Sequence, residues 1–368
     1  MDLEPAERTE PASPAPADSC PPRRMRTPTT DFAVLQALGG DPDAYYRQAN
    51  AQSRAAAGFY NRNIRVLTPS AQSLNVRIPV TGADMMDYRQ WPEAAVLQVI
   101  APYVTAAPRL YWESAQPAYQ IHEFIDGDLL DQLAPRGVAV PEHVPTDVAH
   151  LCARLHAIPR AALPPVPGGL DDDSRRFARR LWDTTRRIYR DLRGPFGRLY
   201  RELGVPDDPF EPLNGAWQSF QPKAFRLIHA DLHRKNMIIR NRETVFLDWE
   251  LALYGDPLCE VAIHLHKMTY LPAEQHRFLT AWAAAEPDAA TGSWEHDVRL
   301  YLVHEQIKSA VLEAVRYAKI IAEGNRTPIE QHLLVTKLVT KLEVAAPLWG
   351  LNTAVDASRV EAALRGPY

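Results

Sequence analysis

The chain has 368 residues, 46% of them hydrophobic, which suffices for a sizeable core and favours two lobes over one compact body. Its 41 basic and 45 acidic residues leave a formal net charge of −4, too even a balance for a nucleic-acid-binding surface. Cys20, Cys152 and Cys259 show no metal-ligand spacing and imply no disulfide framework, which fits a reducing cytoplasm, and no apolar run approaches the ~18 residues of a membrane span.

Residues 1–30 are expected to form a disordered tail. They are rich in proline, alanine and acidic residues, and they lack the basic start and apolar core of a secretory signal. Such a segment cannot bury enough apolar surface to offset its chain entropy. Periodic structure begins only near Asp31, so Met25 is a candidate for the natural start.

Residues 31–126 alternate helical and β-rich runs and predict a small lobe. A first pair of strands is expected over 64–67 and 74–80, and a second pair over 109–112 and 119–124. Between the two pairs, Trp91 begins an amphipathic helix that runs to Ile100, with Val96 and Val99 on its apolar side.

Residues 127–368 predict a larger, mainly helical lobe. A buried helical face is expected within 148–159, and further helices are expected over 272–285, 294–323, 328–346 and 357–364. Asp171, Asp172 and Asp173 precede an amphipathic helix that ends near Leu192 and carries an arginine-rich face, expected to be an ordinary solvated one. Proline and glycine punctuate residues 194–215, which are therefore expected to be loop with one short helical turn.

The stretch 225–257 carries two short acidic signatures. An apolar strand ends just before Asp231, and five residues later the chain returns at Asn236. Residues 237–247 predict a β-hairpin whose second strand sets Asp248 beside Asn236. Three oxygen-bearing side chains are thus expected to converge, as phosphoryl transfer requires: a carboxylate that takes the hydroxyl proton, and hard oxygen ligands for Mg²⁺.

At these residues the chain resembles the superfamily of aminoglycoside phosphotransferases and choline kinases, small-molecule relatives of protein kinases. The pattern His-x-Asp-x-x-x-x-Asn is met by His229, Asp231 and Asn236, and Asp-Trp-Glu and Gly-Asp-Pro follow at 248–250 and 255–257. The resemblance implies that Asp231 is the catalytic base, that Asn236 and Asp248 bind the metal, and that His229 braces the loop.

The resemblance extends into the small lobe. It implies that Arg77 holds the nucleotide phosphates while paired with Glu93, a pairing in which a fixed guanidinium binds phosphate in bidentate fashion. Residues 122–127 match the interlobe hinge, where the backbone groups of Glu123 and Ile125 are expected to contact the purine. A glycine-rich phosphate loop is absent from the sequence, and residues 59–63 are the candidate for its place.

Two other interpretations compete. His229, Asp231 and His233 lie on one face of an extended segment, and with His264 and His266 they resemble a zinc hydrolase site. The later histidines, however, fall two residues apart within a predicted helix and point about 200° apart. The second alternative is an inactive pseudokinase that only binds a ligand, against which Asp231, Asn236 and Asp248 are all present.

The expected fold is α+β and protein-kinase-like, with a small β-rich N-lobe over 31–126 and a large, mainly helical C-lobe over 127–368. The expected activity is transfer of the γ-phosphate of ATP or GTP, with Mg²⁺, to a hydroxyl of a small molecule in the cytoplasm. An antibiotic of nucleoside, macrolide or aminoglycoside type is the expected acceptor, with resistance as the outcome, and a sugar or amino alcohol is the alternative. Acceptor determinants are expected within 195–220 and after residue 270.

Overall fold

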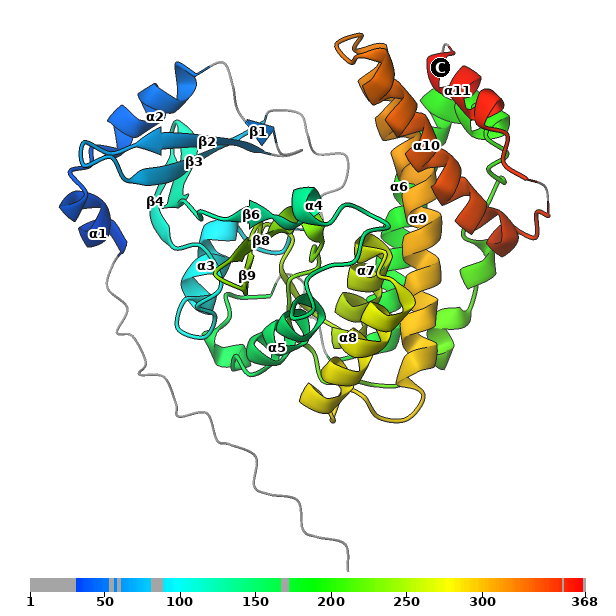
Figure 1. Cartoon of the computed structure of the whole chain (residues 1–368). Coiled ribbons are helices and arrows are strands. Elements are labelled where there is room, and N and C mark those ends of the chain that lie inside the picture. The colour runs from blue at the N-terminus through cyan, green and yellow to red at the C-terminus, as the bar shows by residue number, and fades with distance from the viewer. Residues whose placement is uncertain are drawn as a thin grey trace, which may run out of the picture.

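A five-stranded antiparallel sheet with strand order β1-β2-β3-β5-β4 forms the N-terminal part of the computed structural model (Figure 1). Its strands are β1 (Ala56–Ala57), β2 (Asn61–Leu67), β3 (Ser73–Pro79), β4 (Leu110–Ala115) and β5 (Ala118–Glu123). The structure describes residues 31–52, 56–57, 61–80, 89–166, 172–352 and 354–366. The predicted tail 1–30, with Cys20 and Met25, lies outside these residues, as do Phe59, Tyr60 and Asp171.

Two short helices pack on this sheet and close a small core. They are α1 (Asp31–Ala37) and α2 (Pro42–Asn50). Alternate residues of the strands, among them Ile64, Val76 and Ile121, are almost fully buried against Leu35 and Tyr45. Helix α3 (Glu93–Ile100) belongs instead to the larger core, which ties it to the C-terminal part of the chain.

Short strands and a connecting segment join the sheet to the helical part. Strand β6 (Asp128–Leu129) pairs with β8 (Met237–Arg240), which forms a hairpin with β9 (Glu243–Phe246), while β7 (Arg226–Ile228) pairs with β10 (Leu253–Gly255). The hairpin turn consists of Asn241 and Arg242, whose φ angles of 51° and 65° suit the two-residue turns that match strand twist. The hairpin predicted from the sequence is therefore present.

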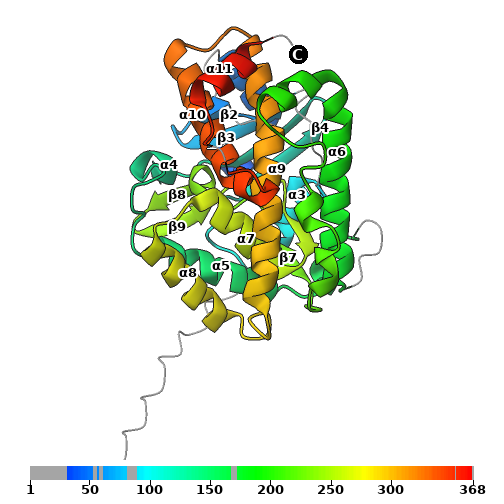
Figure 2. The ribbon, with the colours of Figure 1, turned by 90° about the vertical axis from the view of Figure 1, so that its right-hand side faces the viewer.

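The rest of the chain is helical. Its helices are α4 (Leu130–Leu133), α5 (Val144–His156), α6 (Ser174–Glu202), α7 (Pro257–Met268), α8 (Pro272–Ala285), α9 (Trp294–Ala322), α10 (Pro328–Ala345) and α11 (Ala357–Arg365), with 3₁₀ turns at Arg160–Ala162, Glu211–Leu213, Ala216–Ser219, Arg234–Asn236 and Ala346–Trp349. Helix α9 packs against α6, α7 and α10, and α5 packs against α8 (Figures 1 and 2). The apolar stripe of α9 is buried, at Ile307, Val311, Val315 and Ala318.

One prediction was wrong: residues 194–202 continue a helix. Helix α6 passes through Pro195 with a kink at Phe196, whose φ of −114° and ψ of 18° are not helical. Proline removes one backbone donor and bends a helix without always ending it. Phe196, Leu199 and Tyr200 are buried beyond the kink, so packing on the core stabilises the continuation.

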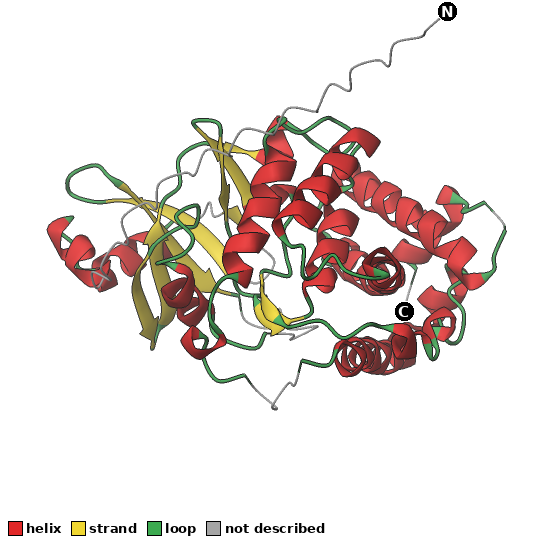
Figure 3. Cartoon of the chain, turned by 90° about the horizontal axis from the view of Figure 1, so that it is seen from below, coloured by secondary structure: helices red, strands yellow, loops and turns green. Residues whose placement is uncertain are grey.

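The α+β, two-lobed fold predicted from the sequence is confirmed. Figure 3 shows the long helices at one end of the molecule, whereas most of the strands, together with a few short helices, lie toward the other end. Among the described residues, no helix is long and apolar enough to cross a membrane.

Candidate functional site

The segment from His229 to Asn236 leaves β7 and forms the loop that carries Asp231. His229 is fully buried, its ring lies 4.4 Å from that of Trp249, and burial lowers its pKa to about 4. The neutral ring therefore donates from Nε2 to the Leu247 carbonyl, 3.1 Å away, which binds the loop to the segment that follows the hairpin. This hydrogen bond fits the bracing role that the resemblance implies for His229.

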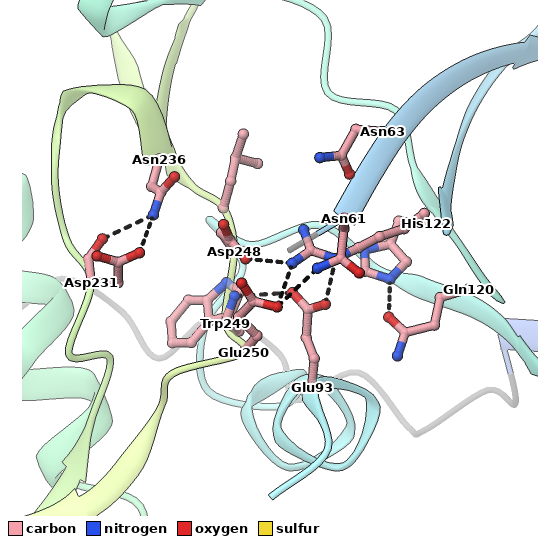
Figure 4. Close-up of polar contacts among 12 residues, drawn as sticks. Asn61, Asn63, Glu93, Gln120, His122, Asp231, Asn236, Asp248, Trp249 and Glu250 are labelled. Carbon is pink, nitrogen blue, oxygen red and sulfur yellow. Dashed lines mark hydrogen bonds and ion pairs between the residues drawn. The ribbon is translucent and has the colours of Figure 1, made fainter. Parts of the chain in front are cut away.

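Asp231 is held by three neighbouring side chains. Nδ2 of Asn236 donates to both the carbonyl and Oδ2 of Asp231, at 3.0 Å each, as Figure 4 shows. Lys267 from α7 contacts Oδ1, and Nε2 of His233 lies 3.6 Å from the same oxygen. Burial opposes ionisation of Asp231, but Lys267 and His233 outweigh it and hold the pKa of this carboxyl well below its usual range.

Asp248 follows the hairpin, in the position that the sequence predicts. The Leu247 N–H donates to the Asn236 carbonyl at 2.8 Å, so the two segments lie side by side. Asp248 itself has a φ of 63°, and this left-handed backbone turns its carboxylate toward Arg77. Asp231 and Asn236 contact each other, whereas Asp248 contacts Arg77, on the side of the N-terminal sheet (Figure 4).

The donor set of Asn236 and Asp248 fits Mg²⁺. Both hydrogen bonds of the Asn236 amide come from Nδ2, which leaves its Oδ1 as a free hard ligand on the side away from Asp231. Asp248 adds a carboxylate. Mg²⁺ is usually held by one or two such side chains together with substrate phosphates rather than by an all-protein cage.

Arg77 lies at the centre of a buried charge cluster and is 6% exposed. Its Nε lies 2.9 Å from Glu93 Oε2, the pairing that the sequence predicts, and its Nη2 lies 2.5 Å from Asp248 Oδ1 and 3.3 Å from Glu250 Oε2. The sequence did not predict the last two contacts. Three carboxylates surround one guanidinium, an arrangement that suits an incoming cation.

Two further contacts fix this cluster. Glu93 Oε1 accepts the Trp249 N–H at 3.0 Å, which ties α3 to the strand end that carries Asp248. Nδ2 of Asn61, at the start of β2, donates to Glu250 Oε2 at 2.8 Å. Burial and the nearby Asp248 raise the pKa of Glu250 to about 7. Residues 61–63 belong to the candidate phosphate loop, and they form the start of strand β2.

The predicted hinge lies between β5 and β6. The Glu123 N–H donates to the Arg109 carbonyl at 2.8 Å, so this group is already engaged, and Ile125 is buried. Gly127 has a φ of 149°, and a Cβ there would lie 2.6 Å from the Ile239 carbonyl. Only glycine allows this close approach, which fastens the connection to β8.

Helix α7 presents a polar face to the loop that carries Asp231. This face was not predicted from the sequence. Glu260 Oε2 accepts the N–H groups of His229 and Ala230, at 2.5 and 2.9 Å, and His264 Nδ1 lies 3.0 Å from the Leu232 carbonyl. Lys267 then contacts Asp231. The spacing of 260, 264 and 267 after Gly-Asp-Pro marks one helical face and is the signal that would have revealed it.

The histidines do not assemble a metal site. His264 Nε2 lies 3.1 Å from the Tyr270 hydroxyl, so both of its ring nitrogens have protein partners. Within the described part of the chain, no three His, Cys, Asp or Glu side chains are placed to hold a metal ion. The zinc hydrolase interpretation therefore lacks a ligand set.

A family model covers most of the chain. Residues 51–296 match the model of a family described as a phosphotransferase enzyme family. No curated protein matches the sequence.

Several solved structures share the fold. A choline kinase from Cryptosporidium parvum Iowa II aligns with a TM-score of 0.55 and 15% identity over 88% of this chain and 97% of its own. A choline/ethanolamine kinase family protein from Mesorhizobium loti aligns at 0.53 and 14% over 92% and 99%. A thermostable mutant of an aminoglycoside phosphotransferase, in a ternary complex with ADP and hygromycin B, aligns at 0.51 and 16% over 88% and 97%.

Proposed function

The chain belongs to this phosphotransferase enzyme family, and we propose that it transfers the γ-phosphate of ATP or GTP to a hydroxyl of a small molecule. The observation that carries the proposal is the arrangement of two linked groups. Asp231 is bonded to Asn236 on one side of the site, and Asp248 is bonded to the Arg77–Glu93 pair on the other. The transferred phosphate belongs between them.

Asp231 is the acceptor-side group in this proposal. Its ionised carboxylate accepts the hydrogen bond of the substrate hydroxyl, orients that oxygen for in-line attack, and receives the proton as the new P–O bond forms. The low pKa of Asp231 keeps it ionised and makes it a weak base. Orientation of the hydroxyl therefore contributes alongside acceptance of its proton, which leaves late in a loose transition state with little need for early deprotonation.

Asn236 and Asp248 would hold Mg²⁺ in the loaded enzyme. The ion supplies positive charge that neutralises the nucleotide phosphates and the developing charge on the leaving group. Arg77 is held in a fixed orientation by Glu93, which suits a guanidinium that contacts phosphate oxygens. ATP as donor is supported by the ADP bound in the structurally similar aminoglycoside phosphotransferase.

We propose an antibiotic as the acceptor, and a hydroxyl-rich one with at most one positive charge, such as a nucleoside or macrolide, before a polycationic one. The support comes from three acidic groups near Lys267. Each already contacts a lysine: Asp231 with Lys267, Glu305 with Lys308, and Glu313 with Lys341. A polycation would have to displace these lysines, whereas a neutral acceptor would not.

A screen of phosphate transfer tests the proposal. Purified protein is incubated with Mg²⁺, ATP or GTP and representatives of the three antibiotic classes, choline and simple sugars, and phosphorylated acceptor is detected by mass. Phosphorylation of a nucleoside or macrolide supports the assignment. Transfer confined to choline or a sugar would indicate a metabolic kinase, and no Mg²⁺-dependent nucleotide binding at all would contradict the kinase function.

A further inference from the structure

Lys267 reaches the catalytic loop from the last turn of α7, and sequence reasoning gave it no role. Its Nζ contacts Oδ1 of Asp231, while Oδ2 of Asp231 accepts from Asn236. The Lys267 side chain is 29% exposed and that of Asp231 is 14% exposed. The Lys267 side chain is thus the more accessible member of the pair.

The local charges keep Lys267 protonated. Burial disfavours the ammonium, but Asp231 outweighs it and, with Glu305 and Glu313 nearby, raises the pKa of Lys267 above its usual value. An ammonium has three N–H donors. One of them serves Asp231, and the others can bind a second anion in the same place.

Two arginines close to the site contact groups other than Asp231. Arg77 is surrounded by Glu93, Asp248 and Glu250. Arg234 is buried and donates to backbone carbonyls, at 3.1 Å to Met268 and 3.0 Å to Val138. In the part of the chain that the structure describes, Lys267 is the permanent cation in contact with Asp231.

Given the proposed function, we propose that Lys267 is a catalytic residue that binds the oxygens of the phosphoryl group during its transfer. The acceptor oxygen forms a bond to the γ-phosphorus, and the bond from that phosphorus to the β,γ-bridging oxygen breaks. Its electron pair leaves on the nucleoside diphosphate, and the acceptor proton passes to Asp231. Lys267 keeps its proton throughout and shares its donors between Asp231 and the equatorial oxygens, where a fixed donor lowers the barrier.

Binding of a transition-state mimic tests this role without a known acceptor. The affinity of the protein for ADP with Mg²⁺ is measured with and without aluminium fluoride, which imitates the phosphoryl group in transfer. Lys267→Met is expected to leave ADP binding unchanged and to weaken the aluminium fluoride complex at least about tenfold. Lys267→Arg, which keeps the charge, is expected to bind the mimic with intermediate affinity.

Lys308→Met is the matched control, because Lys308, on neighbouring helix α9, also pairs with a buried carboxylate, that of Glu305. It is expected to behave like the wild type. Equal affinity of wild type and Lys267→Met for the mimic would overturn the proposal, as would an equal loss in Lys308→Met. If Lys267→Met fails to fold, Lys267→Gln keeps a hydrogen bond to Asp231 and decides the same question. Failure of the wild type to bind ADP with Mg²⁺ would instead contradict the proposed function.

Discussion

Nη2 of Arg77 lies 2.5 Å from Oδ1 of Asp248, so the residue assigned to the nucleotide phosphates bonds directly to the residue assigned to the metal. The same guanidinium binds Glu93 through Nε at 2.9 Å. Under the proposed function, this one carboxylate would serve two cations, Arg77 within the protein and Mg²⁺ with the nucleotide. The contact couples the N-terminal sheet to the catalytic half of the molecule.

Asp248→Ala is expected to abolish the Mg²⁺ dependence of nucleotide binding. Without this hard ligand the metal loses its carboxylate, and the triphosphate charge is no longer compensated at that position. Titration of ATP with and without Mg²⁺ measures the effect. Asp183→Ala removes an exposed carboxylate of α6 and serves as the control. A metal dependence that survives in Asp248→Ala would place the ion elsewhere.

Arg77 and Glu93 are expected to act as one unit in nucleotide binding. Arg77→Ala should raise the nucleotide KM strongly and Glu93→Gln by less, while the double variant should lose much less than the sum. Residues in direct contact typically show coupling of about 0.5–3 kcal/mol. Arg65→Ala, on the adjacent strand and bonded to Ser73, is the control for loss of charge. Strict additivity would mean that the pair does not act on the nucleotide together.

Glu260 is expected to make stability depend on pH. Burial raises its pKa to about 7, although it accepts two backbone N–H groups of the catalytic loop. The folded state therefore binds more protons than the unfolded state, whose glutamate pKa is about 4.3, and the free energy of unfolding falls as pH rises between these values. The loss amounts to about 4 kcal/mol at most and is complete above pH 7.

Glu260→Gln removes this titration and keeps an oxygen that can accept the same two N–H groups. The difference in unfolding free energy between variant and wild type, from urea unfolding at pH 5 and pH 8, is expected to favour the variant more at pH 8. Glu142→Gln, with a side chain 87% exposed, is the control. A difference that does not change with pH would show that Glu260 is ionised in the folded state throughout this range.

Local patterns in the sequence predicted most elements because periodicity records which face of an element is buried. Helix α8 has the predicted bounds, and α9, α10 and α11 differ from the predicted bounds by one residue at one end. The catalytic segment was predictable because Asp231, Asn236 and Asp248 are close in sequence and joined by one hairpin.

Contacts between distant segments were not predictable in this way. Asn61 meets Glu250 across 189 positions, and Lys267 meets Asp231 from a helix that follows the second acidic signature. The local periodicity of the sequence predicts neither contact. The continuation of α6 beyond Pro195 was missed for a related reason, because burial of Leu199 and Tyr200 against other elements decides it.

Asp231→Asn tests whether Asp231 accepts the proton of the acceptor hydroxyl. The amide keeps the size of the carboxylate and its contact with Asn236 in reach, but it cannot accept the hydroxyl proton. The measurement is transfer of labelled γ-phosphate from ATP to an acceptor found in the screen, alongside the affinity for ATP with Mg²⁺. If Asp231 is the base, the variant is expected to transfer phosphate about 10²–10⁴-fold more slowly, with its affinity for ATP nearly unchanged. Near-normal transfer by Asp231→Asn would contradict it.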